Sequence, residues 1–419
     1  MNVSIVDSNY TQEGHFGMAA SWLKYKAEQF DNVKVVDVNF CDYVLMTVSS
    51  QQGVSRVRSE VRKIKKTNKS AKIILGGGGC YAPAIFQDHV DVICVGEGDV
   101  FIETLFQFGF DAAIALDNVW IKGESRKVIP DNYFNFSIPP ILNPDGTYRL
   151  FASRGCRFKC LFCQTGLERN FITAPPDVVD ANKRNASSII SRGGKIAFIT
   201  NDGADKDVAL FGKQEFISVT LRNLKKIMPL NKSSVKGVRI GVEGVSERLR
   251  VAVGKKVDNV ELVDVSAELL ANGIGVRWFF IPGLPYETDE DWDNMRELVL
   301  LLKRKIKKGV VMMNFHSFIP MPATPLSIFP LVDEYWERYD EFRRWFFDGV
   351  GFTRRVQLVN PNQYKSRLRR AMESMAATED ELRRGWWEHN NVNWRVEYLN
   401  SPERLRIMAS GYAARLKAD

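Results

Sequence analysis

Three of the six cysteines in this 419-residue chain lie within eight positions, as Cys156, Cys160 and Cys163 in the segment GCRFKCLFCQTG. Thiolates are soft ligands that suit zinc or iron–sulfur clusters. A closed structural zinc site requires four ligands, and no fourth cysteine or histidine lies nearby in the sequence. A [4Fe–4S] cluster held by three thiolates instead leaves one iron open to a substrate or cofactor. The C-x3-C-x2-C spacing therefore favours such a cluster, with a zinc-stabilised binding protein as the alternative.

The overall composition is that of a globular protein, with 45% hydrophobic and 26% charged residues. No apolar run reaches the roughly 18 residues that a membrane-spanning helix needs. The first residues, MNVSIVDSNYTQEG, lack the basic start and apolar run of a signal peptide and are typical of a buried strand. We therefore expect a cytoplasmic protein without membrane contact, in a compartment where thiols stay reduced. The net charge of +8 permits polyanionic partners.

The first 115 residues alternate short β-branched runs with helix-like segments. This alternation predicts an open, parallel α/β sheet of the Rossmann or flavodoxin-like kind over residues 1–115, followed by a connector at 116–147. The segment 55–72 carries eight basic residues and one acid beside an apolar stripe at helical spacing, and we interpret it as a helix with a solvated basic face.

Strand-like and helix-like segments resume at residue 148 and continue to 330, which predicts a second parallel α/β domain built as a partial or full barrel. Thr288 with Asp291 is a short-acid variant of the capping box and predicts a helix start. Residues 331–419 hold five of the nine tryptophans, and from 341 onward fifteen Lys or Arg stand against ten Asp or Glu. We expect a small, mainly helical, basic and aromatic C-terminal domain there.

The cysteine motif, with Phe162 directly before its last cysteine, resembles the signature of the radical S-adenosylmethionine (SAM) enzymes. Three further segments resemble later strands and turns of that family: SVKGVRIGVEGVSERLRVAVGKKVDNVEL (234–262), GIGVRWFFIPGLPYETDEDW (273–292) and FIPMPATPL (318–326). GEGD (96–99) and the GGGG at 76–79 resemble the cobalamin-type first domain of one branch. The resemblance covers about residues 1–330 and implies a radical SAM partial (β/α)6 barrel at 148–330.

This resemblance also implies a mechanism and a set of partners. A [4Fe–4S] cluster on the three cysteines would cleave SAM to a 5′-deoxyadenosyl radical that abstracts a substrate hydrogen atom, with flavodoxin or ferredoxin as the reducing partner. The positions that it implies for SAM binding are Phe162, Asn201, Asp202, Glu243, Lys255, Lys256, Ile281 and Gly283. Three residues at expected strand ends, where a barrel meets its substrate, are candidate catalytic contacts: His316, Trp278 and Tyr286.

Bound cobalamin is not favoured by the sequence. Many cobalamin domains carry D-x-H-x-x-G after the first strand, with the histidine on cobalt. Here that loop reads DSNYTQEGHFG, in which His15 and Gly17 are present at a different spacing.

For the substrate, the basic and aromatic C-terminal region favours nucleic acid, because arginine pairs with phosphate and tryptophan stacks on an extruded base. The parallel is a radical SAM isomerase that rearranges a hypermodified thymidine in phage DNA. The alternative is a cobalamin-dependent methyltransferase or cyclase acting on a small molecule.

Overall fold

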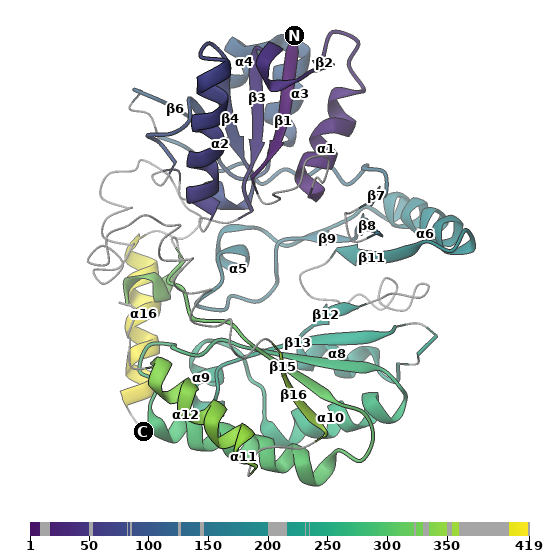
Figure 1. The fold of residues 1–419 in the computed structure, drawn as a ribbon, viewed down its shortest axis with the longest axis vertical. Coiled ribbons are helices and arrows are strands. Elements are labelled where there is room, and N and C mark those ends of the chain that lie inside the picture. The colour runs from purple at the N-terminus through teal and green to yellow at the C-terminus, as the bar shows by residue number, and fades with distance from the viewer. Residues whose placement is uncertain are drawn as a thin grey trace. The chain divides into compact units, whose positions relative to one another are not determined.

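The chain forms two compact units, one of Met1–Arg149 with Arg370–Pro402 and one of Leu150–Arg369 with Glu403–Asp419 (Figure 1). The structure is a computed structural model. It describes residues 1–8, 17–49, 53–81, 83, 86–124, 127–142, 146–199, 216–230, 232–233, 235–321, 324–329, 335–349, 354–359 and 402–417.

The first unit is built on a six-stranded sheet of order β2-β1-β3-β4-β5-β6. Its strands are β1 (Asn2–Asp7), β2 (Lys34–Val35), β3 (Tyr43–Thr47), β4 (Lys72–Gly76), β5 (Val92–Cys94) and β6 (Val119–Ile121). The first five strands are parallel to their neighbours, and β6 alone runs antiparallel, to β5. This arrangement confirms the open parallel α/β sheet that the sequence predicts.

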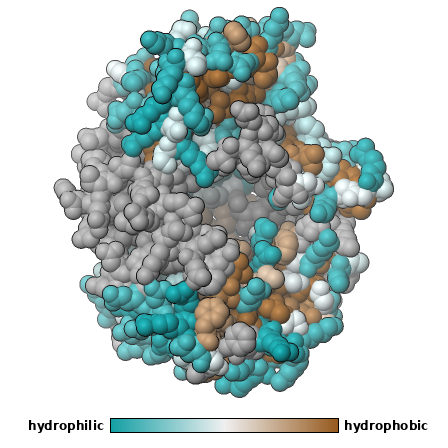
Figure 2. Space-filling model, in the orientation of Figure 1, coloured by the Kyte–Doolittle hydropathy of each residue, from teal (hydrophilic) through white to brown (hydrophobic). Residues whose placement is uncertain are grey.

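Helices cover both faces of this sheet. They are α1 (Met18–Ala27), α2 (Val54–Thr67), α3 (Asp99–Phe108) and α4 (Phe110–Ile114), with short 3-10 turns η1 (Val38–Phe40) and η3 (Gly78–Tyr81). One apolar cluster joins α2 to the sheet, and a second joins α1 and α3 to it. The apolar stripe of α2 is buried as predicted, and Figure 2 shows hydrophilic surface over this helix.

The second unit holds a five-stranded parallel sheet of order β12-β13-β14-β15-β16. Its strands are β12 (Ile217–Val219), β13 (Gly237–Glu243), β14 (Gly275–Phe280), β15 (Val311–Phe315) and β16 (Val356–Val359). The chain enters this unit inside β8 (Thr147–Phe151), which lies between β7 (Ile141–Leu142) and β11 (Lys195–Ile199) in a three-stranded sheet. A separate two-stranded ribbon pairs β9 (Ser153–Arg154) with β10 (Ile172–Thr173).

Helices pack on one face of the five-stranded sheet (Figure 1). The helices of this unit are α5 (Gln164–Glu168), α6 (Pro176–Ser191), α8 (Leu221–Ile227), α9 (Glu247–Ala252), α10 (Asn259–Ala271), α11 (Asp289–Lys305), α12 (Tyr335–Phe347) and α16 (Pro402–Lys417), with the 3-10 turn η5 (Pro325–Ile328). Residues Val276, Trp278 and Phe280 of β14 are buried toward the helices, whereas Arg277 and Phe279 between them are partly exposed on the other face. The predicted strand–helix repetition is thereby confirmed.

Two strands lie outside the residue ranges 1–115 and 148–330, in which the sequence predicts the two sheets. β6 belongs to the first sheet although it lies in the expected connector, and β16 pairs with β15 although it lies in the expected helical C-terminal domain. Both are short, and their place in a sheet depends on a partner distant in the sequence. Elsewhere the described residues after 334 are helical, in α12 and α16. Among the described residues, no helix combines the length and apolar character that crossing a membrane requires.

Candidate functional site

The three cysteines lie on one tight loop between β9 and α5. Gly155 starts this loop with a φ of 71°, and a Cβ there would lie 2.1 Å from the carbonyl oxygen of Asn170, so only glycine fits. Within the loop, the amide of Cys163 donates to the carbonyl of Cys160 at 2.9 Å. The amide of Leu161 donates to the carbonyl of Val253, at the end of α9, at 3.1 Å. These bonds fix the loop against the segment that follows β13.

Burial sets the chemistry of these thiols. Cys160 is 4% exposed, and Cys156 and Cys163 are partly buried. Burial raises the pKa of Cys160 to about 12, against the opposing effect of Lys255, and it also raises the pKa of Cys163. A bound cation reverses this preference, because coordination deprotonates a thiol outright. Without such a cation these buried thiols stay protonated at neutral pH.

The spacing of the three thiols suits a cluster with one thiolate on each of three irons. Within the part of the chain that the structure describes, no three His, Cys, Asp or Glu side chains converge on a point that could hold a single ion. A cubane cluster does not need such convergence, since each thiolate binds a different iron. Three thiols on a nine-residue loop supply one ligand to each of three irons.

A buried ion pair lies next to this loop. The Nζ of Lys255 is 3.3 Å from the Oε1 of Glu243, and each side chain is about one-eighth exposed, at 12% and 13%. Burial raises the pKa of Glu243, and Lys255 opposes that rise. Burial lowers the pKa of Lys255, but the charges of Glu243 and Cys160 outweigh it and leave the value raised. The ammonium and the thiol of Cys160 thus act on each other electrostatically.

The backbone around Glu243 is specialised to present this carboxylate. Glu243 ends β13 with a φ of 74°, and the pairing with β14 shifts register between Gly241 and Glu243. Its carbonyl accepts from the amide of Ile281 at 2.7 Å. A Cβ on Gly241 would lie 2.3 Å from Glu243 Oε1 and 3.3 Å from Lys255 Nζ. Glycine at 241 therefore provides the space that the ion pair occupies.

The other residues expected to bind the cofactor divide into three groups. Ile281 and Gly283 follow β14 beside Glu243, and the Gly283 amide donates to Glu287 Oε2 at 2.9 Å. Phe162 is partly buried within the cysteine loop, whereas Lys256 is exposed and is not drawn into the Glu243 ion pair. Asn201 and Asp202 lie outside the described residues.

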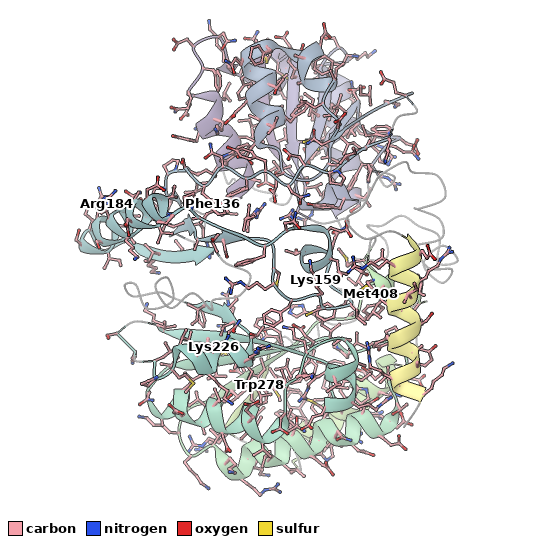
Figure 3. All side chains as sticks on the ribbon, turned by 180° about the vertical axis from the view of Figure 1, so that it is seen from behind. Phe136, Lys159, Arg184, Lys226, Trp278 and Met408 are labelled. Carbon is pink, nitrogen blue, oxygen red and sulfur yellow. The ribbon has the colours of Figure 1, made fainter. Side chains whose placement is uncertain are left out.

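The three expected substrate contacts occupy different environments. Trp278 is fully buried among the helices (Figure 3), where its Nε1 donates to Ser266 of α10 at 3.1 Å. Strand alternation places Trp278 on the face of the sheet opposite to Glu243. His316 is exposed and stacks on Phe279 at 5.8 Å. Tyr286 is 40% exposed, with a φ of 63°, in the turn after β14.

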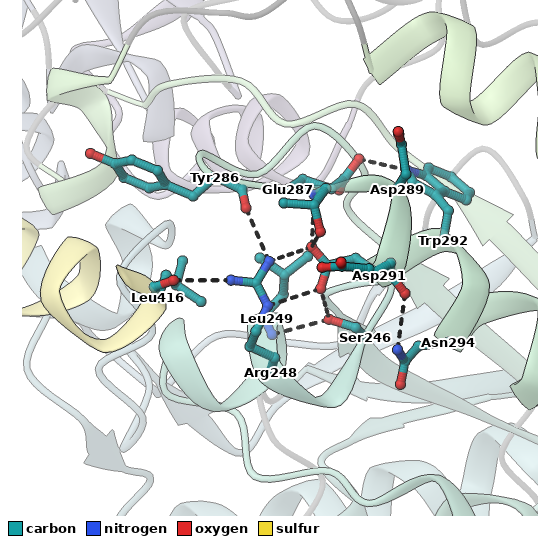
Figure 4. A network of polar contacts seen from close by, with 12 residues as sticks. Ser246, Arg248, Leu249, Tyr286, Glu287, Asp289, Asp291, Trp292, Asn294 and Leu416 are labelled. Atoms are coloured by element: carbon teal, nitrogen blue, oxygen red, sulfur yellow. Dashed lines mark hydrogen bonds and ion pairs between the residues drawn. The ribbon is translucent and has the colours of Figure 1, made fainter. Parts of the chain in front are cut away.

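A buried polar network holds that turn to the helices (Figure 4). Asp291, 2% exposed, accepts from Ser246 and Arg248 and from the amide of Thr288, so the predicted capping box is confirmed. Arg248 also donates to the carbonyls of Tyr286 and of Leu416 in α16. The turn, α11 and the C-terminal helix are thereby joined by one guanidinium and one carboxylate.

Two sets of arginines were not singled out by the sequence. Arg250 is fully buried and donates to the carbonyl of Gly244 at 2.8 Å and to Asn259 at 2.6 Å, and burial lowers its pKa to about 10. Arg239 and Arg277 are direct neighbours on β13 and β14. The alternation R-x-G-x-E in β13 is a signal that could have grouped Arg239 with Gly241 and Glu243 on one face.

Comparisons with known proteins identify a family match for the central part of the chain. Residues 150–299 match the family described as the radical SAM superfamily. An uncharacterised protein of Methanocaldococcus jannaschii is 26% identical over 341 residues, which cover 73% of this chain and 71% of that protein.

Solved structures of the same fold include two described as cobalamin-containing. The radical SAM methyltransferase TsrM from Kitasatospora setae, with cobalamin and a [4Fe–4S] cluster bound, has a TM-score of 0.58 at 13% identity and covers 100% of this chain and 99% of that chain. The cobalamin-dependent SAM radical enzyme OxsB has a TM-score of 0.53 at 18% identity, over 72% of this chain and 52% of that chain.

The family match spans the cysteine loop, Glu243 and Lys255, which are the residues that the geometry brings together. At such low identity the solved structures show the fold, and they extend it to the first unit. Residues 150–299 thus match the radical SAM superfamily, and the whole chain shares its fold with TsrM.

Proposed function

We propose that Cys156, Cys160 and Cys163 hold a [4Fe–4S] cluster and that its remaining iron binds SAM. The observation that carries this proposal is the packing of the cysteine loop against the residues directly before Lys255. The amide of Leu161 donates to the carbonyl of Val253 at 3.1 Å, and a Cβ on Gly254 would lie 3.9 Å from the Cα of Cys160. When bound, the cluster supplies the electron that cleaves SAM, whose adenosyl fragment then takes a hydrogen atom from the substrate.

The residues of the chain would bind and orient SAM. Lys255 would pair with the SAM carboxylate as a point charge, and Glu243 would accept from the ribose or the amino group. The backbone at Ile281 and Gly283 would border the adenine, with Asn201 or Asp202 at the amino end. Phe162 would shield the cluster from water, and the exposed Lys256 is the weaker candidate for the carboxylate.

Cofactor chemistry is tested by anaerobic reconstitution with iron and sulfide, followed by SAM and dithionite. We expect 5′-deoxyadenosine from the wild type and none from Cys160→Ala, together with loss of iron and of cluster absorption in the variant. Cys94→Ala is the matched control, because Cys94 is equally buried but belongs to β5 of the first unit. Equal iron content in Cys160→Ala and Cys94→Ala would contradict the ligand assignment.

For the substrate, we propose a modified base in nucleic acid, rearranged or altered by hydrogen abstraction, as in a phage-type thymidine isomerase. The net charge of +8 and the exposed basic side chains of α2 support this, since phosphate contacts dominate nucleic-acid affinity. Trp386, Trp387 and Trp394 lie outside the described residues. Duplex and single-stranded DNA should bind with an affinity that falls steeply with salt, and salt-independent or absent binding would rule this substrate out.

The second candidate is a cobalamin-dependent methyltransferase or cyclase acting on a small molecule. It is favoured by the fold match to TsrM, which extends over the whole of both chains and includes the first unit. The loop containing His15 lies outside the described residues. To separate the two candidate functions, the protein would be incubated with hydroxocobalamin and then passed through gel filtration. A corrinoid absorption band that stays with the protein favours the cobalamin-dependent enzyme.

Of the expected substrate contacts, His316 is the one we retain beside Glu243. It follows β15 and stacks on Phe279, whose side chain shares a sheet face with Gly241. Tyr286 stays a candidate at the turn, while the complete burial of Trp278 against α10 supports a core role.

A further inference from the structure

Arg250 is a buried cation that the proposed cofactor chemistry does not use. Its side chain on α9 is fully buried, and it forms no ion pair within the described part of the chain. The carboxylates of Glu247 and Asp258 favour its charge, but each accepts a hydrogen bond from a backbone amide instead. A buried charge is costly unless hydrogen bonds compensate for its lost hydration.

This guanidinium binds the backbone on both sides of the Glu243–Lys255 ion pair. Its Nε donates to the carbonyl of Gly244 at 2.8 Å, and its Nη2 donates to the carbonyl of Val245 at 3.4 Å. These two residues directly follow Glu243. Its Nη1 donates to the carbonyl of Val257, two residues after Lys255, at 3.3 Å. One planar group therefore joins the two ends of the segment that separates the paired residues along the chain.

Further contacts of Arg250 fix the same segment. Its Nη1 also donates to Oδ1 of Asn259, at the start of α10, at 2.6 Å. Its carbonyl accepts from the amide of Lys255 at 2.7 Å, so its backbone also holds this lysine. Its Cζ lies 6.0 Å from the ring centroid of Phe280, which pairs with Glu243 across β13 and β14. Arg250 therefore contacts the surroundings of both members of the ion pair.

The donors that this segment needs are those of a guanidinium. The side chain makes four hydrogen bonds from three nitrogens, out of the five donors that arginine offers. Lysine and glutamine carry their donors on a single nitrogen and cannot reach carbonyls at both ends of the segment. Replacing a buried charge with apolar groups of similar volume often leaves stability unchanged or raises it. The geometry of the segment, more than its stability, accounts for an arginine here.

We propose that Arg250 is a positioning residue that holds Lys255 against Glu243, and that it thereby orients SAM without touching it. Without its hydrogen bonds, the ends of the segment are free to separate, and the ammonium can leave the carboxylate. The first step concerns the ion pair alone. The second step, the orientation of SAM, rests on the proposed function.

The first step can be measured on the full chain without cluster or SAM. The folded protein would be acetylated with a trace of acetic anhydride, and mass spectrometry would give the acetylation of Lys255 relative to that of Lys256. We expect a low ratio in the wild type, because the Lys255 side chain is 12% exposed and paired, whereas Lys256 is exposed. Arg250→Gln should raise this ratio severalfold. Arg250→Lys keeps the charge but not the fork and should raise it less.

Ser266→Ala is the matched control for this labelling. It also removes a buried hydrogen bond in the same unit, from Trp278 Nε1 at 3.1 Å, but does not touch the segment, so the ratio should stay at the wild-type value. Asn259→Ala removes one acceptor of Arg250 and should raise the ratio by a smaller amount. It decides the matter if Arg250→Gln does not fold. Ratios in Arg250→Gln and Asn259→Ala equal to that of Ser266→Ala would overturn the proposal.

SAM binding separates this proposal from the proposed function. In the reconstituted protein, Arg250→Gln should bind SAM more weakly than the wild type while its iron content stays the same. A raised labelling ratio with unchanged SAM affinity would contradict the second step, because the ion pair would then not orient SAM. Absence of SAM binding in the wild type would contradict the proposed function, whereas the labelling would still establish or overturn the first step.

Discussion

The ammonium of Lys255 and the carboxylate of Glu243 form a nearly buried pair 3.3 Å apart, beside Cys160. A surface ion pair would contribute little, but a pair withdrawn from water is held in one geometry and is costly to break. Two features of the backbone maintain it: the left-handed conformation of Glu243 and the missing side chain of Gly241. The pair is therefore already built before any cofactor binds.

Gly241→Ala tests this relationship. The new Cβ would lie 2.3 Å from Glu243 Oε1, so the carboxylate must move and its contact with Lys255 must change. We expect SAM to bind about tenfold more weakly, which is about 1.4 kcal/mol, with iron content unchanged. Equilibrium binding of SAM to the reconstituted protein measures this.

The control for that variant is Gly275→Ala on the neighbouring strand. A Cβ at 275 meets only the carbonyl of Lys236 at 3.5 Å and the Cα of Gly237 at 3.9 Å, which are ordinary contacts. SAM affinity should be unchanged there. A loss of affinity equal to that of Gly241→Ala would show that the effect comes from the sheet and not from the ion pair.

Asp291→Ala should destabilise the second unit strongly. It removes the carboxylate that pairs with Arg248 and the acceptor for Ser246 and for the Thr288 amide, so the charge of a partly buried guanidinium loses its counter-charge. Breaking such a pair costs about 3–5 kcal/mol. Urea denaturation followed by tryptophan fluorescence gives the change, and Asp293→Ala on the exposed side of the same helix should cost less than about 1 kcal/mol.

Much of the fold follows from local patterns. The α2 stripe and the capping box at Thr288 are decided by residues within one or two helical turns, and both are found as predicted. β6 and β16 were not predicted as strands of these sheets, because three or four residues carry little periodicity and their partners are distant. Strand pairing between distant segments is a property of the folded chain.

In the candidate site, too, some features can be predicted from nearby residues and others depend on distant ones. The cysteine spacing is readable because its ligands are close in sequence, and the alternation of β14 could have assigned Trp278 to the face of Val276 and Phe280. Arg250 could not be found in this way. Its burial depends on the carbonyls of Gly244 and Val257, which only the folded loop turns toward it.

Tyr412→Phe should loosen the attachment of α16 to the turn after β14. The Tyr412 hydroxyl donates to the carbonyl of Pro285 at 2.6 Å in a buried position, and its loss leaves that carbonyl unsatisfied. We expect a cost of about 1–2 kcal/mol and faster amide hydrogen exchange in α16. Ile407→Ala, exposed on the same helix, should leave exchange unchanged. Equal exchange in both variants would show that the Tyr412 hydrogen bond does not contribute to the attachment of α16.

Glu287 makes stability depend on pH. It is buried after the same turn, where burial raises its pKa to about 8 although Trp292 Nε1 and the Gly283 amide donate to its two oxygens. In the unfolded chain a glutamate ionises near pH 4.3, as is typical. Between that value and about 8, the unfolded state releases a proton that the folded state retains. Stability should therefore fall as pH rises through this window and level off above it.

Glu287→Gln removes this titration. At low pH the variant should be less stable than the wild type, because an amide nitrogen cannot accept from one of the two donors, Trp292 or Gly283. The difference in free energy of unfolding between the wild type and Glu287→Gln should shrink steadily from pH 5 to pH 8, because the wild type alone loses stability over this range. Glu290 is exposed on α11, so the free energy of unfolding of Glu290→Gln should depend on pH in the same way as that of the wild type. Denaturation curves at each pH decide the matter, and a constant difference would mean that the two donors keep Glu287 ionised throughout.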